Sequence, residues 1–401
     1  MVSGKTQLMT TTTIQPHKWV PTYKWPLMTE GLSLQDRTAL ADFITRTDRL
    51  TMGAEVREFE RAWSQWLGCR YSVMVNSGSS ANLLLLAAIK ELQGTGGVIC
   101  QAVTWATNVS PVVQCGFDLR LVDVNLRNFG PDSDDLEALL NETGAKTLFL
   151  THLLGFPAVT DELLQICERH GVTILEDCCE SHGATFNGKK VGTLGVGSTF
   201  SFYYGHHMTT IEGGMICTDR EDLYHLLLPL RSHGLSRELP SPPIVAGIDP
   251  RFTFLIHGYN VRPTEINGFL GQLQLPRLNA AIACRNRNLN AWLTTLDPSF
   301  FRTDFDLTGV SSFSLPLLLR EPATTTLAAV RKILDEQGVE SRPIISGNIA
   351  RQPFLAGVHQ ARRRPKADYI HEQGLYIGNN QYVPEVQVRE TARALNDAFR
   401  Q

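Results

Sequence analysis

Apolar residues follow two periodicities along this chain, and each periodicity predicts a different kind of element. Apolar side chains three and four positions apart predict amphipathic helices over residues 34–46 and 56–67, and Phe59, Trp63 and Leu67 share one face of the second helix. Short apolar runs bounded by polar turns predict strands, the first of them over residues 71–75.

Strands and helices alternate over the first half of the chain. After residues 71–75, the predicted strands are 96–102, 119–124, 147–152, 172–175 and 199–204, and the predicted helices between them are 83–92, 108–115, 132–143 and 161–170. This alternation predicts an α/β fold with a mostly parallel central sheet flanked by helices. Ligands of such sheets bind at the carboxyl ends of the strands, so the residues after each strand are candidates for a site.

The pattern changes in the last third of the chain. A long helical stretch over residues 266–293 is broken at Pro276, because proline has no N–H group for the helix. Strands within 309–319 and 339–345, with helices over 324–337 and 384–400, then predict a smaller α+β unit. We therefore expect a flexible N-terminal arm (1–24), a large domain (25–280) and a small C-terminal domain (281–401).

Composition and charge exclude several classes of protein. The 401 residues are 43% hydrophobic and 19% charged, as in globular enzymes, and the net charge of −3 gives no field that would recruit nucleic acid or an anionic membrane. No apolar run reaches the length of a membrane span, and the first residues lack the apolar core of a signal peptide. The eight cysteines show no secretory spacing, so we expect a cytoplasmic protein without a metal site. The basic run 362–366 is expected to be a solvated loop.

Small residues separate the strand 71–75 from the helix that follows it. Backbone N–H groups at a helix start favour anions, so Gly78 and Ser79 are candidates for binding a phosphate. Serine and asparagine are also ordinary N-cap residues, and that simpler interpretation remains open here.

Two further candidates follow predicted strands. Trp105 comes just after the strand 96–102, where its ring can lie over a bound heteroaromatic group, although tryptophan is also a common core residue. Asp177 follows the apolar strand 172–175, which places a carboxylate over the predicted cleft.

The most unusual segment is T-F-S-F-Y-Y-G-H-H-M-T-T-I-E-G-G, residues 199–214. It predicts a short strand, a turn made possible by Gly205, and two adjacent histidines, His206 and His207. Imidazole moves protons near neutral pH, but a pair of histidines can also simply cap a turn.

Taken together and in order, these motifs resemble the DegT-type sugar aminotransferases, which use pyridoxal phosphate (PLP). The corresponding family pattern is roughly S-F-Y-x-x-K-N-x-T-x-G-E-G-G, in which the lysine forms a Schiff base, and His206 stands at the position of that lysine. The resemblance is strongest to sugar-nucleotide 3-dehydratases of the GDP-4-keto-6-deoxymannose type, which carry His-His here. It extends over about residues 26–400 and implies PLP fold type I, the aspartate-aminotransferase-like fold.

The resemblance also implies roles for individual residues. Gly78, Ser79 and Ser201 would hold the cofactor phosphate, Trp105 would stack on the pyridine ring, Asp177 would pair with the ring nitrogen, and Glu180 would lie near the ring oxygen O3′. Asn260 would reach the phosphate of the neighbouring subunit, which implies a homodimer with a shared active site. His207, Arg237, Arg342 and Asn348 are the expected substrate-binding residues, although Arg342 can equally be an ordinary residue of a strand edge.

The chemistry implied is dehydration of a nucleotide-linked 4-keto sugar. Glutamate would donate the amino group that converts PLP to pyridoxamine phosphate (PMP), and His206, which cannot form a stable imine, would act as the catalytic acid–base group during loss of the C3 hydroxyl.

Three alternatives remain at this stage. The chain can be a sugar aminotransferase-like protein, although the lysine is absent, or a PLP-binding regulator without catalysis. It can also be an iron–sulfur-assisted 3-dehydrase, but no cysteine lies between Cys217 and Cys284, where the cluster ligands are expected.

Overall fold

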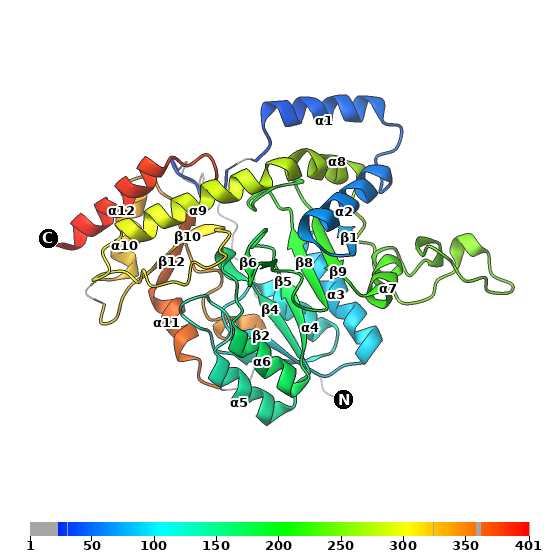
Figure 1. The fold of residues 1–401 in the computed structure, drawn as a ribbon, viewed down its shortest axis with the longest axis horizontal. Helices are drawn as coiled ribbons and strands as arrows, with labels where there is room; N and C mark the ends of the chain where they lie inside the picture. Colours follow the sequence, from blue (N-terminus) through cyan, green and yellow to red (C-terminus); the bar gives the residue numbers. More distant parts are fainter. Residues whose placement is uncertain (1–22, 30, 324, 358–361, 401) are drawn as a thin grey trace, which may run out of the picture.

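A computed structural model describes residues 23–29, 31–323, 325–357 and 362–400 of the chain. The flexible arm expected over residues 1–24 therefore lies almost entirely outside the described residues. The described chain forms a larger unit around a seven-stranded sheet and a smaller unit around a three-stranded sheet (Figure 1).

The large sheet has the strand order β1-β9-β8-β5-β4-β2-β3. Its strands are β1 (Tyr71–Val75), β2 (Gly97–Gln101), β3 (Asp118–Val122), β4 (Thr147–Thr151), β5 (Thr173–Asp177), β8 (Gly197–Ser201) and β9 (Gly214–Thr218). Only β9 runs against its neighbours, since it pairs antiparallel with β1 and β8 while the other pairs are parallel. The mostly parallel sheet expected from the sequence is confirmed.

Helices cover both faces of this sheet because successive strand residues point to opposite sides. In β4, Phe149 packs with α3 and α4, whereas Leu148 and Leu150 pack with α5 and α6. The helices of the larger unit are α1 (Leu34–Arg46), α2 (Ala54–Leu67), α3 (Gly78–Gln93), α4 (Ala106–Gln114), α5 (Ser133–Thr143), α6 (Asp161–His170), α7 (Glu221–Arg231) and α8 (Glu265–Gln274). A short hairpin, β6 (Thr185–Phe186) with β7 (Lys189–Lys190), lies beside the sheet.

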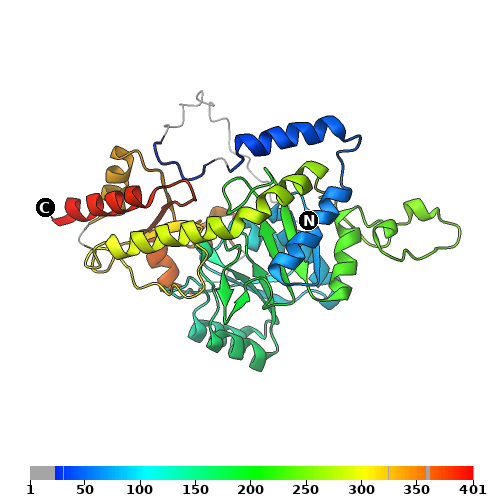
Figure 2. The same ribbon diagram turned by 45° about the horizontal axis from the view of Figure 1, so that its top comes forward.

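A broken helical rod leads out of the larger unit. After α8, a single turn of 3-10 helix at Leu275–Arg277 contains Pro276, and α9 (Leu278–Thr295) then continues toward the smaller unit. The predicted break at Pro276 is confirmed. Figure 2 shows α9 side by side with the last helix, α12 (Glu385–Arg400).

The smaller unit is an antiparallel sheet in the order β10-β12-β11, covered by helices. Its remaining elements are β10 (Ser314–Leu318), α10 (Leu327–Glu336), β11 (Ser341–Pro343), α11 (Pro365–Gln373) and β12 (Gly374–Gly378). Its core also takes in Leu153, Leu154 and Phe156 from the loop after β4, so the two units share one hydrophobic cluster. The domain boundary at residue 280 stays a prediction.

The basic run near residue 362 is not a solvated loop. Arg362 forms ion pairs with Asp135 and Glu142, and Lys366 pairs with Asp132. The reason is that the acidic first turn of α5 faces the run, which is a tertiary contact that the local charge pattern does not show.

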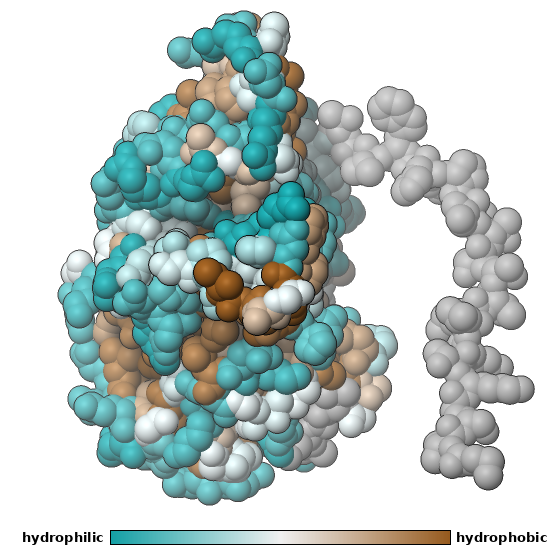
Figure 3. Space-filling view, turned by 90° about the vertical axis from the view of Figure 1, so that its right-hand side faces the viewer, coloured by the Kyte–Doolittle hydropathy of each residue, from teal (hydrophilic) through white to brown (hydrophobic). Residues whose placement is uncertain are grey.

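One segment leaves the body of the molecule. The chain between α7 and α8 projects to the right in Figure 1 and carries exposed apolar side chains, among them Ile244, Phe252 and Phe254, which are 89%, 59% and 58% exposed. Figure 3 looks onto this side and shows a hydrophobic patch in the middle of the face. None of the helices in the described residues combines the length and apolar composition that a bilayer crossing needs.

Candidate active site

Three backbone segments meet at the carboxyl end of β8. A Cβ atom built on Gly78, at the start of α3, would lie 2.6 Å from Cβ of Ser201, the last residue of β8. A Cβ atom on Gly214, at the start of β9, would lie 2.7 Å from the backbone nitrogen of Gly78. Only glycine allows this close approach, and the approach brings Ser201 beside the start of α3.

The start of α3 keeps two backbone N–H groups for a ligand. Ser77 caps the helix, and its Oγ accepts the N–H of Ser80 at 3.1 Å. Over the described part of the chain, the N–H groups of Gly78 and Ser79 have no acceptor, and Ser79 is exposed. With the Ser201 hydroxyl alongside, this helix start has the donors that bind a phosphate.

Asp177 ends β5 and is held by two buried amides. Its Oδ2 accepts Nδ2 of Asn82 at 2.8 Å and Nδ2 of Asn108 at 2.6 Å, and its Oδ1 accepts the N–H of Cys179 at 2.9 Å. Three donors keep this buried carboxylate in place, and Oδ1 retains a free lone pair for a further donor, such as a protonated ring nitrogen.

Trp105 is not a core residue. It lies at the N-terminus of α4, just after β2, and is 55% exposed. The residue before it, Thr104, is buried and its hydroxyl contacts that of Thr151 at 2.9 Å. The backbone is therefore anchored while the indole ring remains available for a ligand.

Glu180 lies in a buried environment close to Asp177. Its Oε2 accepts the N–H of Leu154 at 2.8 Å. Burial, together with the charge of Asp177, raises the pKa of Glu180 to about 8, although the Leu154 hydrogen bond opposes this shift. Glu180 is therefore protonated over much of the neutral range and can donate a hydrogen bond to a ligand oxygen.

The two histidines differ in their surroundings. His207 is 3% exposed, and its Nε2 lies 3.1 Å from the carbonyl oxygen of Ser311, so it points into the protein. His206 is partly exposed; its Nδ1 is buried without a hydrogen-bond partner among the described residues, which leaves Nε2 as the accessible ring nitrogen. Burial and the charge of Arg285 lower the pKa of His206 to about 3, so its imidazole is neutral.

The comparisons with known proteins agree with this geometry. Residues 34–396 match the model of the DegT/DnrJ/EryC1/StrS aminotransferase family. The chain belongs to this family. A GDP-4-keto-6-deoxy-D-mannose 3-dehydratase of Yersinia pseudotuberculosis is 38% identical over 353 residues, which cover 84% of this chain and 90% of the relative. A dTDP-4-dehydro-2,6-dideoxy-D-glucose 3-dehydratase of Saccharopolyspora spinosa is 30% identical over 383 residues, covering 88% and 82%.

A solved structure extends the likeness to the whole fold. The Escherichia coli GDP-4-keto-6-deoxy-D-mannose 3-dehydratase with bound hydrated PLP superposes with a TM-score of 0.88 at 30% identity, over 94% of this chain and all of the other. The expected PLP-dependent aminotransferase-like fold is thereby confirmed.

This member of the DegT/DnrJ/EryC1/StrS family has four predicted ligand residues whose side chains the single chain does not turn toward His206. Arg237 is exposed on the projecting segment and bonds the carbonyl of Arg251. Arg342 is exposed on β11 and pairs with Glu340 at 2.6 Å.

The other two are asparagines. Asn348 is 4% exposed and fully engaged, because its Nδ2 bonds Asp368 and its Oδ1 accepts the N–H of Ala350. Asn260 is exposed and its Oδ1 accepts Nε of Arg262. The next residue, Val261, accepts the N–H of Asn76, so Asn260 lies close in sequence to the turn before α3. The roles assigned to all four stay predictions.

The sequence analysis missed Asn82, Asn108 and Arg285. Asn82 could have been noticed, since a buried amide in the otherwise apolar helix α3 needs a polar partner. Nothing in the local pattern marks Asn108 or Arg285.

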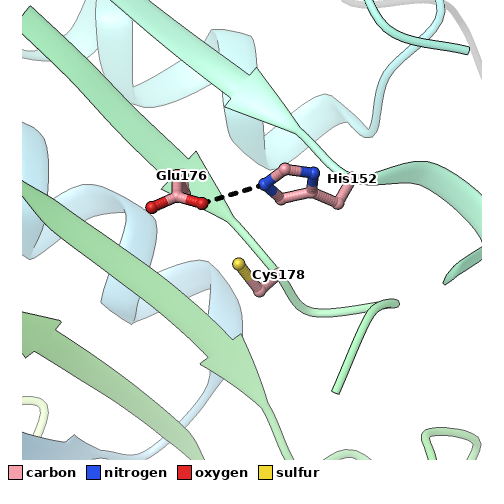
Figure 4. Close-up of side chains that lie close together, drawn as sticks. All are labelled: His152, Glu176 and Cys178. Carbon is pink, nitrogen blue, oxygen red and sulfur yellow. Dashed lines mark hydrogen bonds and ion pairs between the residues drawn. The ribbon is translucent and has the colours of Figure 1, made fainter. Parts of the chain in front are cut away.

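One cluster on the opposite side of β5 has the residue types of a metal site (Figure 4). His152 Nε2, Glu176 and Cys178 lie together and are buried. However, His152 Nδ1 accepts the N–H of Ala158, so Nε2 carries the proton that it donates to Glu176 at 3.1 Å. The Glu176 oxygens also accept the N–H groups of Gly192, Leu194 and Gly195. The donor atoms are already engaged, and the network fixes the loop before β8 to β5.

Proposed function

We propose that this protein is a PLP- and PMP-dependent dehydratase that removes the C3 hydroxyl of a nucleotide-linked 4-keto-6-deoxy sugar, with glutamate as amino donor. The observation that carries the proposal is His206: a neutral imidazole occupies the turn after β8, beside a pocket equipped for a pyridoxal cofactor. Segment 199–214 contains no lysine that could hold the cofactor covalently.

The residues present fit the cofactor. The free N–H groups of Gly78 and Ser79 and the hydroxyl of Ser201 suit its phosphate, and the immobilised carboxylate of Asp177 suits its ring nitrogen. Trp105 offers an exposed ring for stacking. When bound, the cofactor supplies an electron sink for negative charge that develops on carbon.

The protein side chains supply orientation and proton transfer. Asp177 keeps the ring nitrogen protonated, since a carboxylate stabilises a positive charge nearby. Protonated Glu180 donates a hydrogen bond toward the ring oxygen. Nε2 of His206 takes up a proton and returns it to the C3 hydroxyl as this group departs as water.

A shared active site in a homodimer is part of the proposal. The projecting segment between α7 and α8 exposes apolar side chains that a second copy would cover, and Asn260 lies near its base with an exposed amide. In the solved family relatives, two titles name PLP adducts or GDP-linked ligands: one structure has a trapped PLP-glutamate geminal diamine and another has bound GDP-perosamine.

The test is a reconstitution of the reaction. Purified protein, PLP and glutamate are incubated with GDP-4-keto-6-deoxymannose, because GDP-linked 3-dehydratases are among the relatives with the highest identities, 38% and 35%. A dTDP-linked 4-keto sugar serves as the second substrate. The expected product has lost one water, with formation of ammonia and dependence on glutamate. An amino sugar as the product would contradict the proposal, and His206→Asn is the negative control.

A further inference from the structure

A buried arginine lies directly beneath the histidine turn. Arg285, in α9, is 3% exposed. Its NH2 donates to the carbonyl oxygen of His206 at 3.2 Å, and its NH1 donates to the carbonyl oxygens of Phe313, at 3.0 Å, and Asn379. One guanidinium thus joins the turn after β8 to β10 and to the segment that follows β12.

The contacts of Arg285 are unusual for a buried cation. Its hydrogen-bond partners are backbone carbonyls, and the described residues provide it with no carboxylate partner. Buried charges are normally paired, because desolvation of an ion is costly. The retention of an unpaired cation at this place indicates a role that a neutral side chain would not fill.

The motif Gly378–Gln381 is tied to the same arginine. Asn379 returns a hydrogen bond from its Nδ2 to the carbonyl of Arg285 at 2.9 Å, and its Oδ1 accepts Nδ2 of Asn288 at 3.1 Å. The arginine is therefore held rigidly on both sides, and its position relative to His206 is defined by α9 and the chain after β12.

Arg285 and His206 also share a small polar cavity of about 10 Å³, which has room for about one water molecule. Tyr204, Tyr382 and Gln381 contribute to the same wall, and Arg285 is the only residue lining this cavity in the described chain that carries a formal charge. No counter-charge therefore stands between the guanidinium and the imidazole.

We propose that Arg285 is a positioning residue for the reaction of His206, holding the turn through its backbone carbonyl and presenting a positive charge to the imidazole from the protein side. The inference rests on the dehydratase function proposed above. It deepens that function by assigning to the protein interior the task of keeping His206 ready to give up the proton that it takes.

The electrostatic consequence follows from the geometry. The charge of Arg285 lowers the pKa values of His182, His206 and His207, in each case after the larger effect of burial. The other titratable groups near His206 are Tyr203, Tyr204, Tyr382 and Cys284, which are neutral when protonated. A protonated His206 is therefore a strong acid, which suits rapid return of the proton to the departing hydroxyl.

The test compares Arg285→Lys, which keeps the charge, with Arg285→Gln, which keeps donor N–H groups but not the charge. The matched control is Arg287→Gln, which removes an exposed arginine from the same helix. Ring-nitrogen NMR of the protein without cofactor follows the titration of His206, assigned with His206→Asn. Steady-state kinetics of the holoenzyme give kcat and KM across pH.

We expect the His206 titration to move to higher pH in Arg285→Gln and to stay low in Arg285→Lys and Arg287→Gln. We also expect kcat to fall about tenfold or more in Arg285→Gln, with a smaller change in KM and partial recovery in Arg285→Lys. An unchanged His206 titration in Arg285→Gln, or equal losses of kcat in both variants with identical pH profiles, would overturn the proposal.

Two arrangements keep the result decisive. If Arg285→Gln does not fold, Arg285→Lys alone decides, since a His206 titration in the ordinary histidine range in that variant contradicts the proposal and a low one supports it. If the wild type fails to dehydrate the sugar, the proposed function fails, whereas the titration in the cofactor-free protein still tests the electrostatic coupling separately.

Discussion

Nδ2 of Asn108 lies 2.6 Å from Oδ2 of Asp177, and these two buried side chains come from different layers of the fold. Asn108 belongs to α4, and Asp177 is the last residue of β5. Thr104 donates to Oδ1 of Asn108, which orients the amide so that its N–H groups face the carboxylate. The proposed partner of the cofactor nitrogen is thus positioned by a chain of hydrogen bonds that begins beside Trp105.

This relationship gives a first prediction for Asn108→Asp. The substitution places a carboxylate where a donor stood, so Asp177 loses a hydrogen bond and gains a repulsive neighbour. We expect a loss of about 1–3 kcal/mol in the free energy of unfolding and weaker binding of PLP. Urea unfolding and absorbance titration measure the two effects. Asn290→Asp, at an exposed position of α9, is the control, and equal behaviour of both variants would refute the role of Asn108.

A second prediction concerns the catalytic histidine. His206→Lys restores an amine at the position where the family pattern has its Schiff-base lysine, and dehydration should be abolished or diverted toward amino-sugar formation. Borohydride reduction should attach the cofactor covalently to this variant and not to the wild type, as mass spectrometry of the protein can show. Covalent attachment to the wild-type chain would contradict the proposed function.

A third prediction follows from the pKa of Glu180, which burial raises from the ordinary value of 4.5 to about 8. Between these values the folded protein binds a proton that the unfolded chain does not bind, so stability falls as pH rises through this window. Glu180→Gln removes this penalty. The gain in unfolding free energy over the wild type should be near zero at about pH 4.5 and increase by up to about 1.4 kcal/mol per pH unit toward pH 8.

Urea unfolding of the cofactor-free protein at several pH values tests this expectation. Glu168→Gln, an exposed position of α6, is the control and should show no pH-dependent gain. A gain in Glu180→Gln that is the same at all pH values would show that the carboxyl group is not protonated in the folded protein.

A fourth prediction concerns the close packing at the start of α3. In Gly78→Ala, the new Cβ would lie 2.6 Å from Cβ of Ser201 and 3.0 Å from Sγ of Cys179, so one of the segments must move. Such overpacking costs about 1–3 kcal/mol and should displace the phosphate donors. We expect weaker PLP binding in a fluorescence titration, whereas Gly96→Ala, whose Cβ would meet nothing within 4 Å, should bind normally.

A fifth prediction tests the shared active site. His206→Asn and Asn260→Ala are each expected to be inactive or strongly impaired. If His206 of one chain works with Asn260 of the partner, a mixed dimer contains one site with both native residues. Unfolding and refolding an equimolar mixture should then restore about a quarter of the wild-type activity. Mixing without any recovery would place both residues in the same chain's site, or show that no dimer forms.

The sequence predicted well where a local pattern alone determines an element. The strand at 71–75 and the helix at 161–170 have the bounds observed for β1 and α6, because alternation or helical spacing is complete within each segment. The helix after β1 begins earlier than expected, at Gly78, because Ser77 caps it and the small residues join the first turn. The element β12 and helix α11 were not predicted; they depend on pairing with β10 and on packing over the smaller unit.

The candidate site divides in the same way. By itself, the sequence determined the order of the motifs, the identity of His206 at the decisive turn, and the residues that follow each strand, since these are properties of contiguous segments. Only the tertiary structure decided that Asn82 and Asn108 hold Asp177, that Arg285 lies beneath His206, and that Asn348 is already engaged. These contacts join residues far apart in the chain, and their energies depend on burial and on the alignment of donors with acceptors, which no local pattern encodes.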